Sequence, residues 1–327
     1  MIGVPLPKTI AEGDDVVYKG MMKGSIFLLL FLLIFPLSAA ASGITADSYL
    51  LVEKETFNVI AGKDYHRPLP PASTTKVMTT ILALEKLDEE QGVVATKRVL
   101  SIPPSKLSLS PGSSYKAIDL IEGALVESAN DAAYALSIAV AGSEERFAEM
   151  MNEKAREIGA TNTNFVNASG LYDPDHRVSA YDLALIFRYA LGNSRFQEII
   201  GMKYFCFRRG NAEVRYKNHN RLLFCFAPSV GGKTGFTRAS KHCYVGAFEK
   251  EGRTYILSLL GSTNLWGDAT AILQQIYTEV PSQRELSLVR AGHIALSSYT
   301  VKKEKKTRAK KRLRKARKGK RQRLRRA

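Results

Sequence analysis

The 327-residue sequence has little cysteine and no cysteine pair at the spacing of a metal or redox site. Its three cysteines, Cys206, Cys225 and Cys243, form no C-x-x-C pair, which argues against a zinc or thioredoxin-like centre. We therefore expect neither a metal nor a cofactor. An odd count leaves at least one thiol outside any intramolecular disulfide, and a Cys206–Cys225 bridge and three free thiols both remain open.

Long hydrophobic runs are also lacking. The one uninterrupted apolar run, residues 26–37, is shorter than the roughly 20 residues that a membrane-spanning helix needs. It follows Lys19 and Lys23 and precedes Ser38-Ala39-Ala40-Ala41-Ser42, which is the order of regions in a secretory signal peptide. Residues 1–41 therefore predict export to the periplasm or the outer face of the cytoplasmic membrane. An uncleaved membrane anchor is the alternative.

The first 20 residues contain acidic side chains, which are unusual at the start of a signal peptide. Met21 and Met22 stand directly before the basic Lys23. Translation that begins at either methionine would leave the expected layout of a signal peptide.

Positive charge is concentrated at the C-terminus. Residues 302–326 contain 17 Lys or Arg and one acid, so they account for +16 of the net charge of +17. Such a segment cannot bury a core, and we expect residues 283–327 to form a short linker and a disordered basic tail. Near an anionic membrane surface or wall polymer each cation contributes about 1 kcal/mol. A solvated tail without a partner is the alternative, and an exported protein gives no reason to expect nucleic acid.

The remaining sequence, residues 42–282, reads as one catalytic domain. Internal repeats and regular βαβ alternation are both absent. The apolar periodicity predicts helices and strands as follows: helices at residues 74–87, 130–141 and 143–158, and strands at residues 48–53, 57–60, 204–208, 213–216, 241–248 and 254–260. This order predicts an α+β (α/β) fold, an antiparallel sheet flanked by helices with a helical subdomain.

Three short motifs carry the chemistry. They are Ser73-Thr74-Thr75-Lys76, Ser128-Ala129-Asn130 and Lys233-Thr234-Gly235. Each is weak alone, but their order and contexts support one another.

The first motif predicts an activated nucleophile. A serine needs a base beside it, and residues three apart on a helix share a face, so Lys76 can reach the Ser73 hydroxyl. Burial and the charge of Lys233 would both lower the pKa of Lys76 and make it a base. The start of a helix also offers free N–H groups to a developing oxyanion.

The third motif predicts a substrate-binding strand. Lys233-Thr234-Gly235 follows two glycines and precedes a strand pattern, so it should lie at a sheet edge beside the serine. Such an edge can hold an extended peptide by backbone hydrogen bonds, and Gly235 permits close approach.

With these motifs the sequence resembles the low-molecular-mass penicillin-binding proteins, the D-alanyl-D-alanine carboxypeptidase family. The resemblance extends over roughly residues 44–275. It includes the segments Pro71-Ala72-Ser73-Thr74-Thr75-Lys76, Glu127-Ser128-Ala129-Asn130-Asp131, Ser169-Gly170-Leu171, Asn220-Arg221-Leu222-Leu223 and Gly232-Lys233-Thr234-Gly235-Phe236. It implies a β-lactamase/transpeptidase-like fold and removal of the terminal D-alanine from peptidoglycan pentapeptide stems.

The resemblance also implies a role for each motif residue. Ser73 would attack the peptide carbonyl, Lys76 would activate it, and Ser128 would pass a proton to the leaving amine. Asn130 would hold the substrate amide, and Lys233 and Thr234 would bind the terminal carboxylate. Gly235 would let the substrate approach, and the N–H groups of Ser73 and Phe236 would form the oxyanion hole. β-Lactam antibiotics would acylate Ser73.

Two departures leave other activities open. Relatives often carry an arginine about 35 residues after the motif lysine, where this sequence has Leu265-Trp266-Gly267-Asp268, so Arg238 is a candidate to read the carboxylate instead. A D,D-endopeptidase acting on cross-links is therefore an alternative. A β-lactamase is less favoured, because residues 162–173 contain no glutamate to serve as a deacylating base. A non-catalytic wall-binding protein is the remaining alternative.

Overall fold

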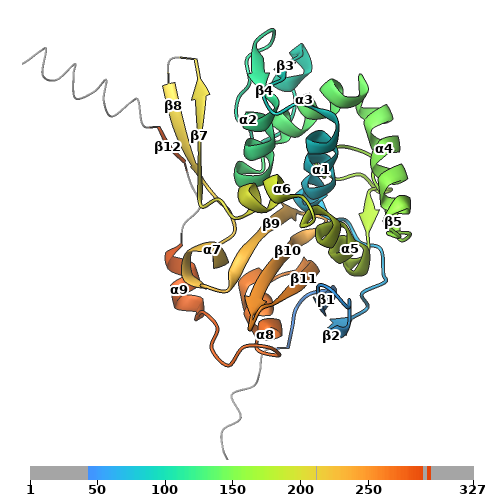
Figure 1. The fold of residues 1–327 in the computed structure, drawn as a ribbon, viewed down its shortest axis with the longest axis vertical. Coiled ribbons are helices and arrows are strands. Elements are labelled where there is room, and N and C mark those ends of the chain that lie inside the picture. The colour runs from blue at the N-terminus through green and yellow to red at the C-terminus, as the bar shows by residue number, and fades with distance from the viewer. Residues whose placement is uncertain (1–42, 211, 290–292, 296–327) are drawn as a thin grey trace, which may run out of the picture. The chain divides into compact units, whose positions relative to one another are not determined.

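The computed structural model describes residues 43–210, 212–289 and 293–295 (Figure 1). The expected signal peptide and the basic tail lie outside the described residues. Within the described part, no helix has the length and apolar character needed to cross a membrane.

A five-stranded antiparallel sheet forms the centre of the fold. Its strands are β1 (Ser48–Glu53), β2 (Val59–Lys63), β9 (Ser229–Thr237), β10 (Lys241–Lys250) and β11 (Arg253–Ser262), in the order β2-β1-β11-β10-β9. The motif Lys233-Thr234-Gly235 therefore lies on an edge strand, as the sequence predicts.

Both faces of the sheet are buried, because apolar side chains occupy both sets of alternating positions. Leu50 and Val52 belong to one core cluster, and Leu51, between them, belongs to the other. The same alternation separates Val245 from Tyr244 on β10. Helix α5 (Ala180–Ala190) packs on the first face, and α8 (Leu265–Leu273) packs on the second.

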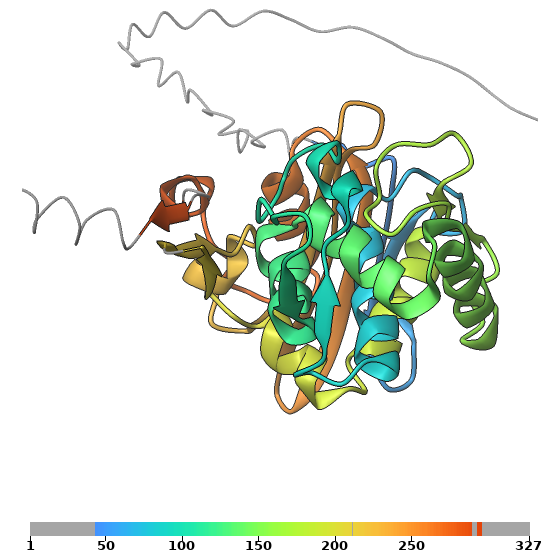
Figure 2. The same cartoon turned by 90° about the horizontal axis from the view of Figure 1, so that it is seen from above.

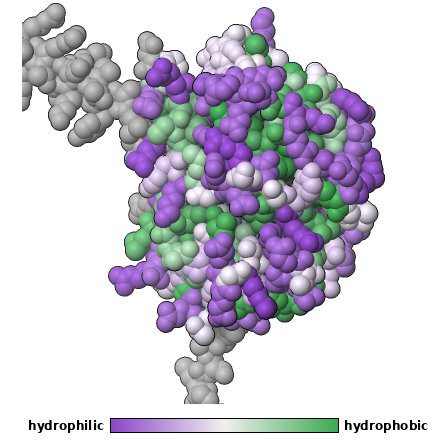
Figure 3. All heavy atoms as spheres, viewed as in Figure 1, coloured by the Kyte–Doolittle hydropathy of each residue, from purple (hydrophilic) through white to green (hydrophobic). Residues whose placement is uncertain are grey.

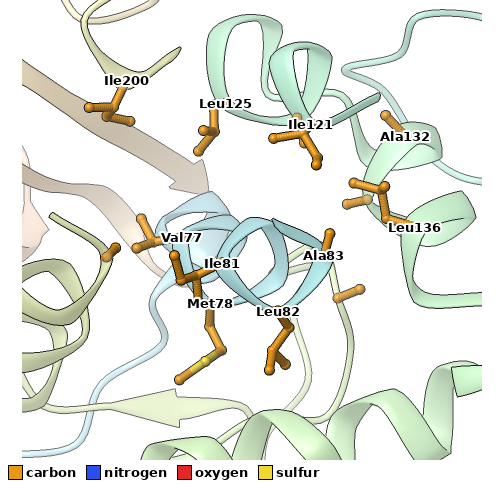
Figure 4. Close-up of a cluster of buried hydrophobic side chains, with 14 of the residues drawn as sticks. Val77, Met78, Ile81, Leu82, Ala83, Ile121, Leu125, Ala132, Leu136 and Ile200 are labelled. Atoms are coloured by element: carbon orange, nitrogen blue, oxygen red, sulfur yellow. The ribbon is translucent and has the colours of Figure 1, made fainter. Parts of the chain in front are cut away.

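A helical subdomain covers the α5 side of the sheet (Figures 1 and 2). Its helices are α1 (Lys76–Lys86), α2 (Ala117–Glu122), α3 (Asn130–Ala141), α4 (Glu144–Glu157) and α6 (Ser194–Ile200). The first eight residues of α1 are all buried, and its apolar side chains lie among those of the surrounding helices (Figure 4). This packing fixes the helix whose N-terminal end carries the serine motif.

The other elements are short. They are the strands β3 (Gly92–Val94), β4 (Ser114–Lys116), β5 (Thr163–Asn164), β6 (Arg177–Val178), β7 (Tyr204–Arg209), β8 (Ala212–Lys217) and β12 (His293–Ala295), the turns of helix η1 (Ala72–Thr75), η2 (Lys97–Leu100) and η3 (Gly123–Glu127), and the helices α7 (Leu222–Cys225) and α9 (Gln283–Leu288). The face in Figure 3 has hydrophilic side chains interspersed with apolar areas.

Most predicted elements are present, with shifted ends. The strand at residues 48–53 has its predicted bounds, whereas the second strand begins at Val59 and not at residue 57. Ser143 caps α4 by accepting a hydrogen bond from the Arg146 N–H at 3.1 Å. Packed structure also continues past the expected domain end at residue 282, because α9 follows with Leu286 buried.

All three cysteines are free thiols. Cys206 is exposed on β7, Cys225 is partly buried on α7, and Cys243 is buried in the sheet. The structure therefore contains no Cys206–Cys225 bridge, the pairing that the sequence left open.

The buried side chain of His176 forms a hydrogen bond with the turn that carries Ser73. The Nδ1 atom of His176 accepts the Val166 N–H at 3.1 Å, so the ring proton sits on Nε2, which lies 2.9 Å from Thr75 Oγ1. Thr75 Oγ1 in turn donates to the carbonyl oxygen of Ala72, next to Ser73. Burial lowers the pKa of His176 to about 4, against an opposing effect of Asp173, so the ring is neutral at pH 7.

We expect His176→Asn to lower the free energy of unfolding by about 2–3 kcal/mol at pH 7.5, because buried partners lose their hydrogen bonds. Between pH 6.5 and about 4, His176 binds a proton in the unfolded chain but not in the folded one. The contribution of His176 to the free energy of unfolding, which is fully present above pH 6.5, therefore falls by about 3 kcal/mol as the pH approaches 4. Urea unfolding should therefore show a shrinking difference between wild type and variant on acidification. A difference that stays constant, or a matching effect of the control His66→Asn at an exposed position, would contradict this account.

Candidate active site

The serine turn is pressed between the sheet edge and a second loop. Ser73 lies in η1, between β9 and α1, and follows Ala72, which has a φ of +49°. A Cβ added to Gly235 on β9 would lie 2.8 Å from the Ser73 nitrogen. A Cβ at Gly170, where φ is +78°, would overlap the Ala72 carbonyl oxygen. Both glycines thus permit backbone approaches that any side chain would block.

Lys76 is fully buried and surrounded by oxygen atoms. Its Nζ lies 2.9 Å from Ser73 Oγ, 2.6 Å from Asn130 Oδ1 and 2.7 Å from the Ser169 carbonyl oxygen. Burial lowers the pKa of Lys76 well below its usual value, the charge of Lys233 lowers it further, and Asp131 opposes both. These effects favour a neutral amine.

The three contacts of a neutral Lys76 determine the directions in which its two N–H hydrogens point. An uncharged amine has two N–H donors and one lone pair, and the carbonyl oxygens of Asn130 and Ser169 can only accept. The two hydrogens therefore point to these oxygens, which leaves the lone pair directed at the Ser73 hydroxyl. In this arrangement Ser73 donates its proton to the lysine.

A second buried lysine lies on the other side of the site. Lys233 Nζ donates to Ser128 Oγ and to the Thr234 carbonyl oxygen, both at 2.9 Å. Burial lowers the pKa of Lys233 to about 7, with Glu127 acting in the opposite direction. Ser128 itself has a left-handed backbone, with φ at +64°, at the junction of η3 and α3.

Asn130 joins the lysine to the loop that forms a wall of the site. Its Oδ1 faces Lys76, and its Nδ2 donates to the carbonyl oxygens of Pro103 and Pro104 at 3.0 and 3.1 Å. The adjacent Asp131 carboxylate, which is fully buried, accepts the N–H groups of the same loop at residues 107–109. The expected contact of Asn130 with a substrate amide remains a prediction.

These groups border a cleft of about 350 Å³. The described residues that line it are Ser73, Pro104, Ser105, Ser128, Asn130, Gly170, Leu171, His219, Arg221, Thr234, Gly235, Phe236, Thr237, His242, Leu265 and Trp266. None of them is acidic. A larger hollow of about 730 Å³ lies among α1, α4 and α5, but none of the motif residues lines it.

The structure brings the predicted site residues together. Ser73, Ser128, Asn130, Thr234, Gly235 and Phe236 line the cleft, and Lys76 and Lys233 lie buried behind the two serines. Arg238 is on the exposed turn between β9 and β10 and does not line the cleft.

Sequence reasoning found Asn130 but missed the other groups that hold Lys76 and the serine turn. His176 carried no local motif, and the Ser169 carbonyl oxygen lies 93 positions from Lys76 in the chain. Asn167 shapes that loop, because its Oδ1 accepts the N–H groups of residues 169–171. The sequence Asn167-Ala168-Ser169-Gly170 offered the one local signal, a turn with a glycine at positive φ.

Comparison with known proteins gives one family. The family model for D-alanyl-D-alanine carboxypeptidases matches residues 36–264. The chain is 33% identical over 235 residues to D-alanyl-D-alanine carboxypeptidase DacB2 of Mycobacterium tuberculosis, covering 69% of this chain and 80% of the relative. It is 31% identical over 262 residues to DacF of Bacillus subtilis, covering 78% of this chain and 63% of the relative.

Solved structures agree. The D-alanyl-D-alanine carboxypeptidase from Mycobacterium tuberculosis aligns with a TM-score of 0.68 at 31% identity, covering 75% of this chain and 96% of that one. A mutant of a Streptomyces DD-transpeptidase aligns with a TM-score of 0.66 at 26% identity, covering 71% of this chain and 97% of that one. The motifs, the fold and these matches show that the chain belongs to the D-alanyl-D-alanine carboxypeptidase family.

Proposed function

We propose that this protein is a serine-type D-alanyl-D-alanine carboxypeptidase that removes the terminal D-alanine of peptidoglycan stem peptides. The observation that carries the proposal is the buried Lys76 amine, whose Nζ lies 2.9 Å from Ser73 Oγ and has the Asn130 and Ser169 carbonyl oxygens as its other hydrogen-bond partners. A serine becomes nucleophilic when such a base takes its proton.

In the first step Ser73 Oγ attacks the carbonyl carbon between the two D-alanines, and its proton passes to Lys76. The oxyanion lies between the N–H groups of Ser73 and Phe236. The C–N bond then breaks, and Ser128 donates a proton to the leaving amine of D-alanine while Lys233, 2.9 Å away, replaces it. Water then attacks the acyl ester: its hydroxyl stays with the product acid, its proton returns through Ser128 to Lys233, and Ser73 Oγ leaves with the proton that Lys76 holds.

The cleft favours a peptidase over a β-lactamase. A β-lactamase needs a carboxylate that activates the deacylating water, and no described cleft residue is acidic. By the same mechanism a β-lactam would acylate Ser73 and remain attached for long periods. A D,D-endopeptidase uses the same groups on a cross-linked peptide and is the second candidate.

We expect the purified protein to release D-alanine from a peptide that ends in D-Ala-D-Ala, and Ser73→Ala to lower the rate by at least about 1000-fold. The readout is free D-alanine, measured by an amino-acid oxidase assay. Release by both proteins would contradict the assignment of Ser73. Cleavage of cross-linked muropeptides, without release from the linear peptide, would favour the endopeptidase.

The rate should also depend on the charge of Lys233. With a pKa of about 7 this lysine is charged below pH 7 and neutral above it, so its attraction for the substrate carboxylate weakens as the pH rises. We expect kcat/KM to fall above pH 7, since this ratio reports the ionisation of the free enzyme. In Lys233→Arg the guanidinium stays charged, so any residual activity should lack this alkaline limb. An identical limb in the variant would assign it to another group.

We further propose that the protein is exported and that its basic tail holds it at an anionic membrane surface or wall polymer. The described body supports this proposal with a basic hairpin formed by β7 and β8, which stands out from the sheet in Figure 1. Lys203, Arg208, Arg209, Arg215 and Lys217 lie on or beside it, and none of them forms an ion pair with a described carboxylate. Strand β12, which precedes the tail in sequence, pairs with β8.

Deleting residues 302–327 should leave D-alanine release unchanged and weaken sedimentation with phosphatidylglycerol vesicles or purified sacculi at low salt. The physical reason is the loss of 17 cations, whose attraction to an anionic surface salt screens. A chain that carries a Gly/Ser tail of equal length is the matched control for size. Sedimentation that is equal for all three chains at low salt would refute the proposal.

A further inference from the structure

Arg221 is the one permanently charged residue among the described residues that line the cleft. It lies at the start of α7, between the basic hairpin and β9, and shares the cleft wall with Thr234, Phe236 and Trp266. Nothing in the proposed mechanism uses it.

The backbone on both sides of Arg221 is fixed. Asn218 donates from Nδ2 to the Met202 carbonyl oxygen at 2.8 Å and accepts the Asn220 N–H at 2.8 Å. Asn220 Oδ1 accepts the Leu222 N–H at 3.1 Å. These bonds hold the turn in place and so fix where the arginine side chain begins.

The guanidinium group has spare hydrogen-bonding capacity. Nη1 donates to the Leu286 carbonyl oxygen at 3.3 Å, its one hydrogen bond to a described residue, and a guanidinium carries five N–H donors. No described carboxylate lies within ion-pairing distance of it. A cation in a cleft without acidic residues is placed to bind an anion from solution.

The charge of Arg221 acts at the Phe236 end of the cleft. His242 pairs with Phe236 across β9 and β10, and the two rings are 4.6 Å apart. Arg221 lines the same cleft as Phe236 and His242, and its charge adds to burial in lowering the pKa of His242. The end of the motif strand beyond Gly235 therefore has a positive charge beside it.

Lys233, the other cation expected to attract the carboxylate, is buried and donates to Ser128 Oγ and the Thr234 carbonyl oxygen. Leu265 and Trp266 line the cleft as apolar walls, and the buried Asp268 carboxylate accepts hydrogen bonds from Thr45 and Ser262. Arg238 is exposed outside the cleft.

We propose that Arg221 binds the terminal carboxylate of the substrate. It would take the part of the arginine that relatives often carry in the region where this chain has the uncharged Leu265 and Trp266. The inference rests on the proposed function. A guanidinium can give two parallel N–H donors to a carboxylate, so it selects a free C-terminal acid over an uncharged end. Arg221 would thus add to the attraction of Lys233 and favour peptides that end in a free D-alanine.

The test compares a peptide ending in D-Ala-D-Ala with the same peptide as its C-terminal carboxamide. We expect wild type to prefer the acid, and Arg221→Gln to lose about 10- to 100-fold in kcat/KM on the acid with little change on the carboxamide. Arg221→Lys should recover part of the preference, because the charge returns without the fork of donors. Arg238→Gln is the matched variant and should keep the full preference.

Three results would overturn the inference. Arg221→Gln could keep the acid preference, it could lose equally on both peptides as a purely structural residue would, or Arg238→Gln could be the variant that loses the preference. If wild type releases no D-alanine, the proposed function fails, but the acylation rates of Ser73 by penicillin and by penicillin methyl ester still test Arg221. In that pair the variant should lose its advantage for the free acid, and an unchanged ratio would count against the proposal.

Discussion

Two lysine side chains, Lys76 and Lys233, are fully buried in one small site, and water solvates neither. Desolvation disfavours the charged form of both lysines, and the charge of Lys233 further disfavours the charged form of Lys76, so two full positive charges in the site are costly. The surrounding residues supply hydrogen-bond acceptors for both amines. Asn130 Oδ1 and the Ser169 carbonyl oxygen accept from Lys76, and Ser128 Oγ and the Thr234 carbonyl oxygen accept from Lys233.

The architecture follows from the need to bring those oxygens together. They come from the helical subdomain, from the loop at residues 167–171 and from the edge strand β9, three regions far apart in sequence. Helix α1 can hold a buried lysine at its first residue because apolar side chains pack around the rest of it. The glycines at positions 170 and 235 let the loop and the strand approach the serine turn closely enough to complete the site.

Local patterns predicted much of this arrangement. The alternation at residues 48–53 and the cap at Ser143 depend on neighbours in sequence, and both are where the pattern puts them. Three other features depend on tertiary contacts, so no local sequence pattern predicts them. They are the π-helical turn Gly123–Glu127, the left-handed backbone of Ser128 and the neutral ring of His176. The motif residues were found because their spacing is local, whereas the contact of Asn130 with Lys76 and the Ser169 carbonyl acceptor depend on the folded chain and were not found.

Asn130 gives the site a property that none of its other residues has. One planar amide holds the base through its oxygen and the wall loop through its nitrogen, so the two cannot move independently. A bulky ligand that pushes the loop outward must turn this amide and remove an acceptor from Lys76. The position of the loop and the hydrogen bonding of the catalytic amine are therefore coupled through one side chain.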